Sequence, residues 1–217
     1  MTDLYLFGTN SLSAILTSYI QSDSRYLLRG ITVNKEYVDA EEFSGVPLIP
    51  FEDLSPNPDS FGIINCVGYS GQMELREAVS QNVMHKGIPL LSYAHLSSII
   101  DGVSFGENNI VMANVTIEPN SVVGNGNVFY GGGYICHNAL IGDFNWFSAK
   151  CVFAGNVRVG YRNFIGINAC VRDGVEIGSM SIIGMGAVVV NDVRSNTIVI
   201  GNPAIEREMK AGGIRNG

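Results

Sequence analysis

A six-residue period runs through the second half of the chain and restricts its fold more than any other feature. Every sixth position from residue 105 to residue 189 holds a large apolar residue. The fifteen positions are Phe105, Val111, Ile117, Val123, Phe129, Ile135, Ile141, Phe147, Phe153, Val159, Ile165, Val171, Ile177, Ile183 and Val189. Such a period fits neither an α-helix nor a simple series of hairpins. It predicts short strands that run round a prism, with one inward-facing anchor on each face.

A slower period of eighteen residues groups these hexads into coils. Glycines recur at this spacing, and so do asparagines, whose column ends in a serine: Gly106, Gly124, Gly142, Gly160 and Gly178; Asn109, Asn127, Asn145, Asn163 and Ser181. Three hexads therefore make one coil, and the segment holds about five coils. Equivalent residues of successive coils should stack at the strand spacing of about 4.8 Å.

Turn-forming residues mark the corners of this parallel β-helix. One corner column is Asn114, Gly132, Lys150, Asn168 and Gly186, and a second runs through Pro119-Asn120, His137-Asn138, Gly155-Asn156, Asp173-Gly174 and Asn191-Asp192. Asparagine and glycine tolerate the left-handed backbone conformation that a tight corner needs, and Lys150 is the exception in the first column.

The first half of the chain has a different pattern, in which strands alternate with helices. We expect strands at residues 4–7, 28–34, 61–67 and 88–91, and helices at residues 11–20, with Ser11 as N-cap, and 72–85. This alternation predicts a small, Rossmann-like parallel α/β sheet. We divide the chain into an α/β domain at residues 1–92, a β-helix at 93–204 and a tail at 205–217, with a short helix starting at Ile205.

Composition excludes several classes of partner. Acidic residues outnumber basic ones by 20 to 13, and the net charge is −7, which argues against nucleic acid and anionic membranes. We expect no membrane span and no secretory signal. The four cysteines form no CxxC pair, so a reducing cytoplasm is the expected compartment.

The turn after the first strand leaves two interpretations open. A dinucleotide fingerprint needs GxGxxG, whereas this chain has Gly8, Asn10 and Ser13 at those positions. Spacing alone favours an ordinary strand-to-helix turn. The alternative is a nucleotide-sugar pocket beside Asn10, Ser11, Asn34 and Gly68, because backbone N–H groups at a helix start can bind phosphate.

His137 is the strongest candidate for chemistry among the three histidines. We interpret His85, at a helix end, and His95, before the first coil, as structural. His137 occupies a corner, where a histidine has no structural purpose, and Gly155 lies eighteen residues later, one coil above. A base would thus lie beside a backbone N–H that can stabilise an oxyanion. A surface histidine without a role is the alternative.

Three further residues each allow two interpretations: two lie beside His137 in the sequence, and the third is the single tryptophan, beside the Asn145 corner. Asn138 is either a rung of a turn ladder or a residue that orients the imidazole through its amide oxygen. Cys136 is expected to be a packing residue rather than a nucleophile. Trp146 either stacks on a ligand or covers an edge. A zinc carbonic anhydrase on a similar β-helix needs about three histidine ligands, and the coils hold only His137, so that class is excluded and we expect no metal.

These residues resemble a known family. The hexapeptide repeat, the segment at 135–143 around His137 and the closing Val199-Ile-Gly-Asn-Pro-Ala204 are similar to left-handed β-helix acyltransferases. With the α/β domain in front, the chain looks like the sugar O-/N-acyltransferases of the sialic acid O-acetyltransferase type. It is similar in particular to the bacillosamine-pathway enzyme that acetylates a UDP-linked amino sugar. The match covers residues 3–204.

The resemblance implies a homotrimer that binds acetyl-CoA between neighbouring β-helices and a nucleotide-linked sugar in the N-terminal domain. It implies His137 as general base and the Gly155 N–H facing the thioester carbonyl, and it makes Asn138 a candidate member of the catalytic set. The CoA groove would be lined by Trp146, Ile167, Met185 and Pro203, with Gly155 at the thioester. Asn10, Ser11, Asn34 and Gly68 would meet the sugar nucleotide. The family often has an acidic residue where this chain has Asn138.

The resulting hypothesis is direct transfer of an acyl group to a sugar amine in a ternary complex, without an acyl-enzyme, in surface-glycan or lipopolysaccharide biosynthesis. An O-acetyltransferase of a sugar or sialic acid hydroxyl is the nearest alternative. A non-catalytic trimeric nucleotide-binding scaffold is another. A nucleotidyltransferase is excluded, since it needs a glycine-rich basic motif that is absent.

Overall fold

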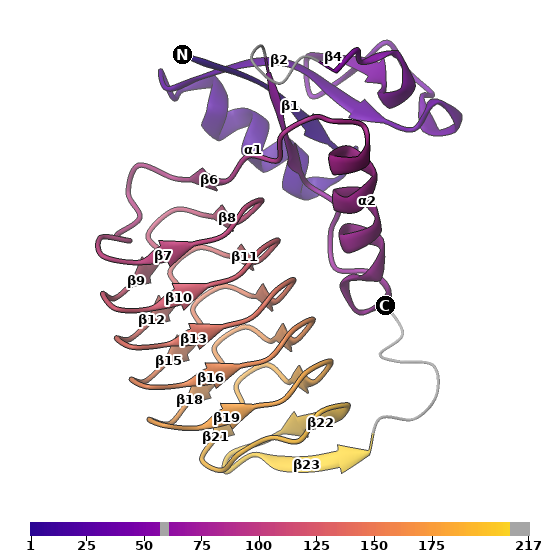
Figure 1. Cartoon of the computed structure of the whole chain (residues 1–217). Helices are drawn as coiled ribbons and strands as arrows, with labels where there is room; N and C mark the ends of the chain where they lie inside the picture. The colour runs from indigo at the N-terminus through magenta and orange to yellow at the C-terminus, as the bar shows by residue number, and fades with distance from the viewer. Residues whose placement is uncertain (57–60, 209–217) are drawn as a thin grey trace. The chain divides into compact units, whose positions relative to one another are not determined.

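The computed structural model describes residues 1–56 and 61–208, and the chain divides into two compact units, Met1–Tyr93 and Ala94–Gly217 (Figure 1). The first unit is built on a five-stranded sheet in the order β3-β4-β2-β1-β5. Its strands are β1 (Thr2–Phe7), β2 (Tyr26–Val33), β3 (Glu42–Phe43), β4 (Val46–Pro50) and β5 (Gly62–Asn65). Only the β3–β4 pair is antiparallel, so the expected parallel α/β sheet is confirmed.

Two helices accompany this sheet in the part of the unit that the structure describes. They are α1 (Ser11–Gln21) and α2 (Glu74–His85), and short 3-10 turns lie at Lys35–Tyr37, Phe51–Asp53 and Gly71–Met73. The α1 prediction is confirmed, but its N-cap is Asn10 rather than Ser11. Asn10 has extended backbone angles and its Oδ1 accepts the N–H groups of Leu12 and Ser13. Ser11 is instead the first helical residue.

One predicted strand and the predicted start of one helix in this unit were wrong, and one hairpin was not predicted. Residues 88–91 form no strand, because only Leu90 makes a bridge, to Ile63. The β3–β4 hairpin was missed: β3 has only two residues, and the β4 segment Val46–Pro50 contains two prolines, which do not favour a strand prediction. Helix α2 starts later than predicted because Met73 has a left-handed backbone (φ 67°) that separates it from the 3-10 turn.

The second unit is a left-handed parallel β-helix with three sheets. The first contains β7 (Ser104–Phe105), β10 (Val122–Val123), β13 (Leu140–Ile141), β16 (Arg158–Val159) and β19 (Glu176–Ile177). The second contains β9 (Thr116–Ile117), β12 (Tyr134–Ile135), β15 (Val152–Phe153), β18 (Cys170–Val171) and β21 (Val188–Val189). The third contains β6 (Tyr93–Ala94), β8 (Ile110–Val111), β11 (Val128–Phe129), β14 (Trp146–Phe147), β17 (Phe164–Ile165), β20 (Ile182–Ile183), β22 (Thr197–Ile200) and β23 (Ile205–Glu208).

The predicted anchors form the core of this unit. Strands from Ser104 to Val189 pair with a step of eighteen residues, and all fifteen anchors except the half-buried Phe105 are buried. Phe129 and Phe147 stack with ring centroids 4.6 Å apart. The asparagine column is buried too, and each Oδ1 accepts the backbone N–H one coil later, as Asn127 does from Asn145. Stacked hydrogen bonds and stacked apolar side chains therefore stabilise the same coils.

The corner predictions are also confirmed. All five residues of the first column, Lys150 included, have φ between 57° and 72°. Asn120, Asn138, Asn156 and Gly174 adopt the same conformation in the second column. The conformation strains a lysine more than an asparagine or glycine.

The expected helix at the start of the tail was wrong. Ile205–Glu208 is strand β23, which pairs antiparallel with β22, and the rest of the predicted tail lies outside the described residues. A returning strand satisfies backbone groups at the open edge of the last coil, which a helix would leave unpaired. In the described ranges, no helix is both long enough and apolar enough to cross a membrane.

Candidate active site

His137 lies at the corner between β12 and β13, with its ring against the glycine one coil above. A Cβ atom at Gly155 would lie 2.6 Å from Cε1 and 2.9 Å from Nε2 of His137, and 3.0 Å from Oδ1 of Asp173. Gly155 itself is buried, whereas His137 is exposed. Only a residue without a side chain allows the imidazole edge to lie this close to the backbone. The predicted pairing of His137 with Gly155 is therefore a feature of the structure.

The backbone N–H groups of this corner column differ in what they bind. The N–H of His137 donates to Oε2 of Glu118 at 2.8 Å. The equivalent N–H of Gly155 has no acceptor within residues 1–56 and 61–208. The Glu118 carboxylate, which accepts the His137 N–H, shows that a negatively charged oxygen can bind an N–H group of this column. The Gly155 N–H can therefore receive a ligand oxygen.

Glu118 is a residue that sequence reasoning missed. Its Oε1 accepts the Tyr134 hydroxyl at 2.7 Å, and this bond, together with the His137 N–H, lowers the pKa of its carboxyl. Glu118 is thus ionised at neutral pH and holds the His137 backbone. Cys136 beside it is half-buried, and burial raises the pKa of its thiol. A Cys136 thiolate nucleophile is correspondingly disfavoured.

A ladder of polar side chains starts from the other side of the imidazole. Asn138 Nδ2 lies 3.0 Å from His137 Nδ1 and donates to Asn156 Oδ1 at 3.3 Å. Asn156 Nδ2 in turn donates to Asp173 Oδ1 at 3.1 Å. Asn138 therefore meets the ring with its amide nitrogen, and the expectation of an amide oxygen was wrong. The eighteen-residue step through His137, Gly155 and Asp173 was the signal for the last member.

The residues predicted for a CoA groove do not gather around His137 within one chain. Ile167 and Met185 are exposed, and both follow third-sheet strands, β17 and β20. They lie at one edge of the second sheet, and His137 lies at its other edge. Pro203 lies in the turn between β22 and β23. Trp146, on β14, is only 9% exposed and packs against Tyr130 with ring centroids 5.1 Å apart.

The residues predicted for a sugar nucleotide follow neighbouring parallel strands. Asn10 and Ser11 follow β1, Asn34 follows β2, and Gly68 follows β5. The strands end together, since Phe7 pairs with both Thr32 and Asn65. The chain leaves β1 for β2 on one side and later returns as β5 on the other. This is a topological switch point, where open α/β sheets bind ligands.

Side chains near this sheet edge form hydrogen bonds that fix its turns, and other polar groups of the edge remain at the surface. The Asn10 side chain is occupied, because it caps α1 and its Nδ2 donates to Cys66 O at 2.8 Å. Arg76 is fully buried, and its Nη1 donates to the carbonyls of Asn65 and Val67. Asn10 and Arg76 therefore position the two turns. Ser11, Asn34 and Gly68 are left at the surface.

The remaining histidines have contacts that suit structural roles. His85 is the last residue of α2. His95 Nδ1 lies 2.8 Å from Ser97 Oγ and accepts the Ser97 N–H, which holds the turn before the first coil. Among the described residues, no group of three or more His, Cys, Asp or Glu could hold a metal ion.

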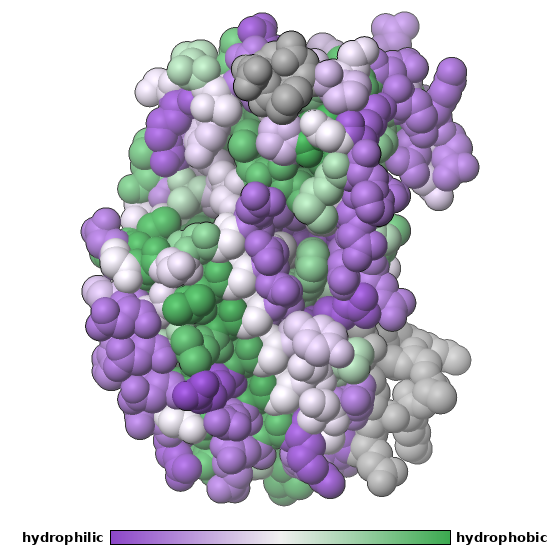
Figure 2. Space-filling view, in the orientation of Figure 1, coloured by the Kyte–Doolittle hydropathy of each residue, from purple (hydrophilic) through white to green (hydrophobic). Residues whose placement is uncertain are grey.

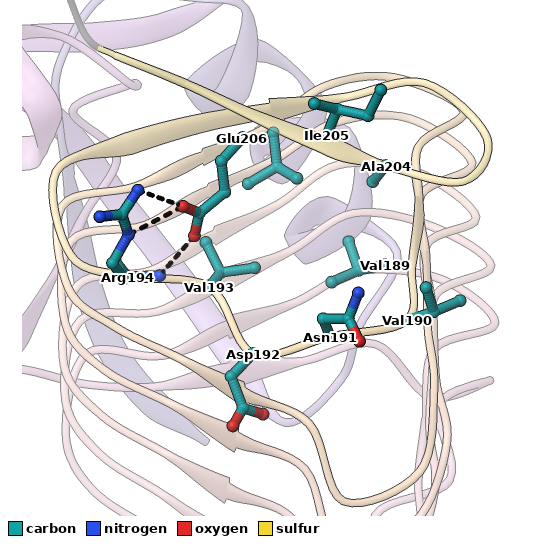
Figure 3. A pocket seen from close by; sticks show the side chains of 10 residues that line it. Val189, Val190, Asn191, Asp192, Val193, Arg194, Ala204, Ile205 and Glu206 are labelled. Atoms are coloured by element: carbon teal, nitrogen blue, oxygen red, sulfur yellow. Dashed lines mark hydrogen bonds and ion pairs between the residues drawn. The ribbon is translucent and has the colours of Figure 1, made fainter.

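A cavity of about 420 Å³ lies at the far end of the β-helix, away from His137 (Figure 3). Its apolar lining includes Val189, Val193 and Val199. Glu206 reaches over it from β23, accepts the Arg194 N–H and pairs with the Arg194 guanidinium at 2.7 Å. The cavity is the end of the core under the returning strand, and it contains none of the predicted site residues.

Comparison with known proteins finds likeness in structure alone. No protein-family model matches the chain, and neither does any curated protein sequence. A perosamine N-acetyltransferase variant from Caulobacter crescentus, solved with CoA and GDP-perosamine, superimposes with a TM-score of 0.85 at 24% identity, covering 95% of this chain and 97% of that one.

Two further solved structures have a similar fold over nearly the whole chain. The acetyltransferase domain of PglB from Neisseria gonorrhoeae gives a TM-score of 0.81 at 24% identity, covering 95% of this chain and 100% of that one. WeeI from Acinetobacter baumannii gives 0.84 at 20% identity, with coverage of 95% and 100%. The chain shares the fold of these proteins. That likeness confirms the predicted combination of an α/β domain with a left-handed β-helix.

Proposed function

We propose that the protein transfers an acyl group from acetyl-CoA to the amino group of a nucleotide-linked sugar. The observation that carries this proposal is the His137–Gly155 corner, where an imidazole edge lies against a backbone N–H that has no other acceptor among the described residues. A thioester carbonyl on that N–H would have its carbon beside Nε2 of His137. Polarisation of the carbonyl and an adjacent imidazole are what acyl transfer requires.

The N-terminal sheet edge supports a nucleotide sugar as the acceptor. Ser11, Asn34 and Gly68 surround the switch point between β1 and β5, which is the usual place for a nucleotide in such a sheet. The proteins of like fold support the same choice, because one of them was solved with both CoA and GDP-perosamine. We propose that the nucleotide part of the substrate binds at this edge.

We also propose that the enzyme is a homotrimer whose CoA grooves lie between neighbouring β-helices. Apolar side chains are exposed on both sheets that meet at the His137 corner: Tyr134 and Val152 on the second sheet, and Val122 and Leu140 on the first. Figure 2 shows hydrophobic surface over β10 and β13. A second copy on these sheets would bring its own Ile167 and Met185 within reach of a groove. Light scattering of wild type and Leu140→Arg would test the assembly.

The substrates and the cysteines support a proposal for the setting of the reaction. Acetyl-CoA and nucleotide sugars are cytoplasmic metabolites, and the four cysteines are free. We propose that the enzyme works in the cytoplasm, in a pathway that builds a surface glycan such as lipopolysaccharide.

The direct test is CoA release from acetyl-CoA in the presence of a panel of amino-sugar nucleotides. Wild type should turn over at least one of them, and His137→Ala should lose at least about a hundredfold of that rate. His85→Ala, at the end of α2, is the matched control and should keep full activity. Full activity in His137→Ala would refute the site. A thermal-shift experiment with CoA separates the enzyme from a non-catalytic scaffold, because a bound ligand raises the melting temperature.

A further inference from the structure

The polar ladder beside His137 has a direction, and that direction determines which ring nitrogen carries the proton. An ionised carboxylate only accepts hydrogen bonds. Asn156 must therefore turn its NH2 group toward Asp173 and its oxygen toward Asn138, in agreement with the 3.1 Å contact. Reversing the Asn156 amide would place two oxygens against each other.

The same reasoning extends one coil down. The oxygen of Asn156 needs a donor, so Asn138 turns its NH2 group toward it, at 3.3 Å. That same nitrogen lies 3.0 Å from His137 Nδ1. An amide nitrogen only donates, so Nδ1 of the neutral ring must be the acceptor, and the proton of the ring must be on Nε2.

We infer that Asp173, acting through Asn156 and Asn138, sets the tautomer of His137 so that Nε2–H, and not a lone pair, faces the Gly155 corner. Asp173, Asn156 and Asn138 are then positioning residues. This inference rests on the proposed function only for its catalytic consequence. It replaces the expected general-base role of His137 by that of a hydrogen-bond donor to the acyl oxygen, beside the Gly155 N–H.

The inference also predicts the class of acceptor. An unprotonated amine attacks the thioester carbon with its own lone pair: the N–C bond forms, the carbonyl electrons move to oxygen, and the two N–H donors stabilise that charge. When the intermediate collapses, the C–S bond breaks, CoA leaves as thiolate, and the proton lost by nitrogen goes to solvent or to sulfur. A hydroxyl needs a base before it attacks, and this tautomer offers none at Nε2. The site therefore favours amino sugars over hydroxyl acceptors.

The tautomer can be measured without any substrate. The chain has three histidines, so ¹⁵N-histidine labelling with His85→Gln, His95→Gln and His137→Gln spectra assigns each ring. At about pH 8.5, where histidine rings are neutral, we expect wild-type His137 to have a protonated Nε2 and an unprotonated Nδ1. The reverse pattern would overturn the inference.

Two variants test the ladder itself. Asn138→Asp places an acceptor beside Nδ1 and should move the proton to Nδ1. Aspartate tolerates the left-handed backbone conformation that Asn138 has at this corner. Asp173→Asn removes the acceptor-only end and should shift the His137 signals toward a mixture of tautomers. Asp143→Asn is the matched control, because Asp143 accepts an asparagine amide in a different corner, and it should leave the His137 signals unchanged. Unchanged signals in Asp173→Asn would show that the ladder does not control the ring.

Kinetics test the consequence separately. Asn138→Asp should raise the rate on a hydroxyl acceptor relative to the matching amine by at least about tenfold, since it restores a base at Nε2. An unchanged ratio in a variant whose tautomer has reversed would overturn the link to acceptor choice. Because the spectra are recorded on the free protein, a complete lack of acyl transfer would refute the proposed function and leave the tautomer result standing.

Discussion

Gly155→Ala is the substitution that most directly tests the His137 corner. The new Cβ would lie 2.6 Å from His137 Cε1, whereas carbon atoms pack at about 3.5–4.0 Å. The ring must therefore retreat by about 1 Å. A displacement of this size at a reacting centre costs about a hundredfold in rate, so we expect turnover to fall by that factor. The backbone of Gly155 is not left-handed and His137 is exposed, so the free energy of unfolding should fall by less than about 1 kcal/mol.

The assay is CoA release, combined with urea unfolding, in a double-mutant cycle with His137→Ala. If the new methyl group acts by displacing the ring, Gly155→Ala should cost little further in the His137→Ala background. An equal loss in both backgrounds would show that the effect does not pass through the imidazole. Wild-type turnover in Gly155→Ala alone would refute the argument that ring position matters.

Three further substitutions test the scaffold. Asn10→Ala should lower the free energy of unfolding by about 1–2 kcal/mol in urea, because it removes the α1 cap, while Asn10→Asp, which keeps the capping oxygen, should lose less. Phe147→Ala should cost about 3–5 kcal/mol in the same experiment, since it opens a cavity beside Phe129; a loss below about 1 kcal/mol would contradict the stacked core. Glu118→Gln tests pH dependence: the pKa of Glu118 is lowered in the folded state, so the wild-type stability advantage should be complete at neutral pH and vanish as pH falls through that lowered pKa. An advantage that persists under acid conditions would show that the carboxylate is not its source.

Much of the β-helix could be predicted from the sequence because its order is local and periodic. An inward apolar residue at every sixth position and a turn residue at each corner specify both the coil and its register, so fourteen of the fifteen anchors are buried as predicted. The α/β unit was harder. Strand β3 of its β3–β4 hairpin has only two residues, and its last predicted strand, at residues 88–91, forms only a single bridge. Short apolar runs do not distinguish such segments from strands.

The tail was mispredicted for a related reason. The sequence from Ile205 has only a weak helical pattern. The last coil leaves an unpaired strand edge, and this segment pairs with it as β23. That edge exists only in the tertiary structure, so the sequence pattern does not reveal it.

The sequence by itself determined that His137 and Gly155 lie one coil apart, because they are eighteen residues apart and each coil of the repeat has eighteen residues. Only the tertiary structure decided how the side chains at that corner meet. Side-chain contacts depend on rotamers and on partners one or two coils away, as with Glu118 on the His137 N–H and the amide nitrogen of Asn138 on the ring. The direction of the ladder from Asp173 follows from hydrogen-bond chemistry once those contacts are known, and spacing alone carries no such direction.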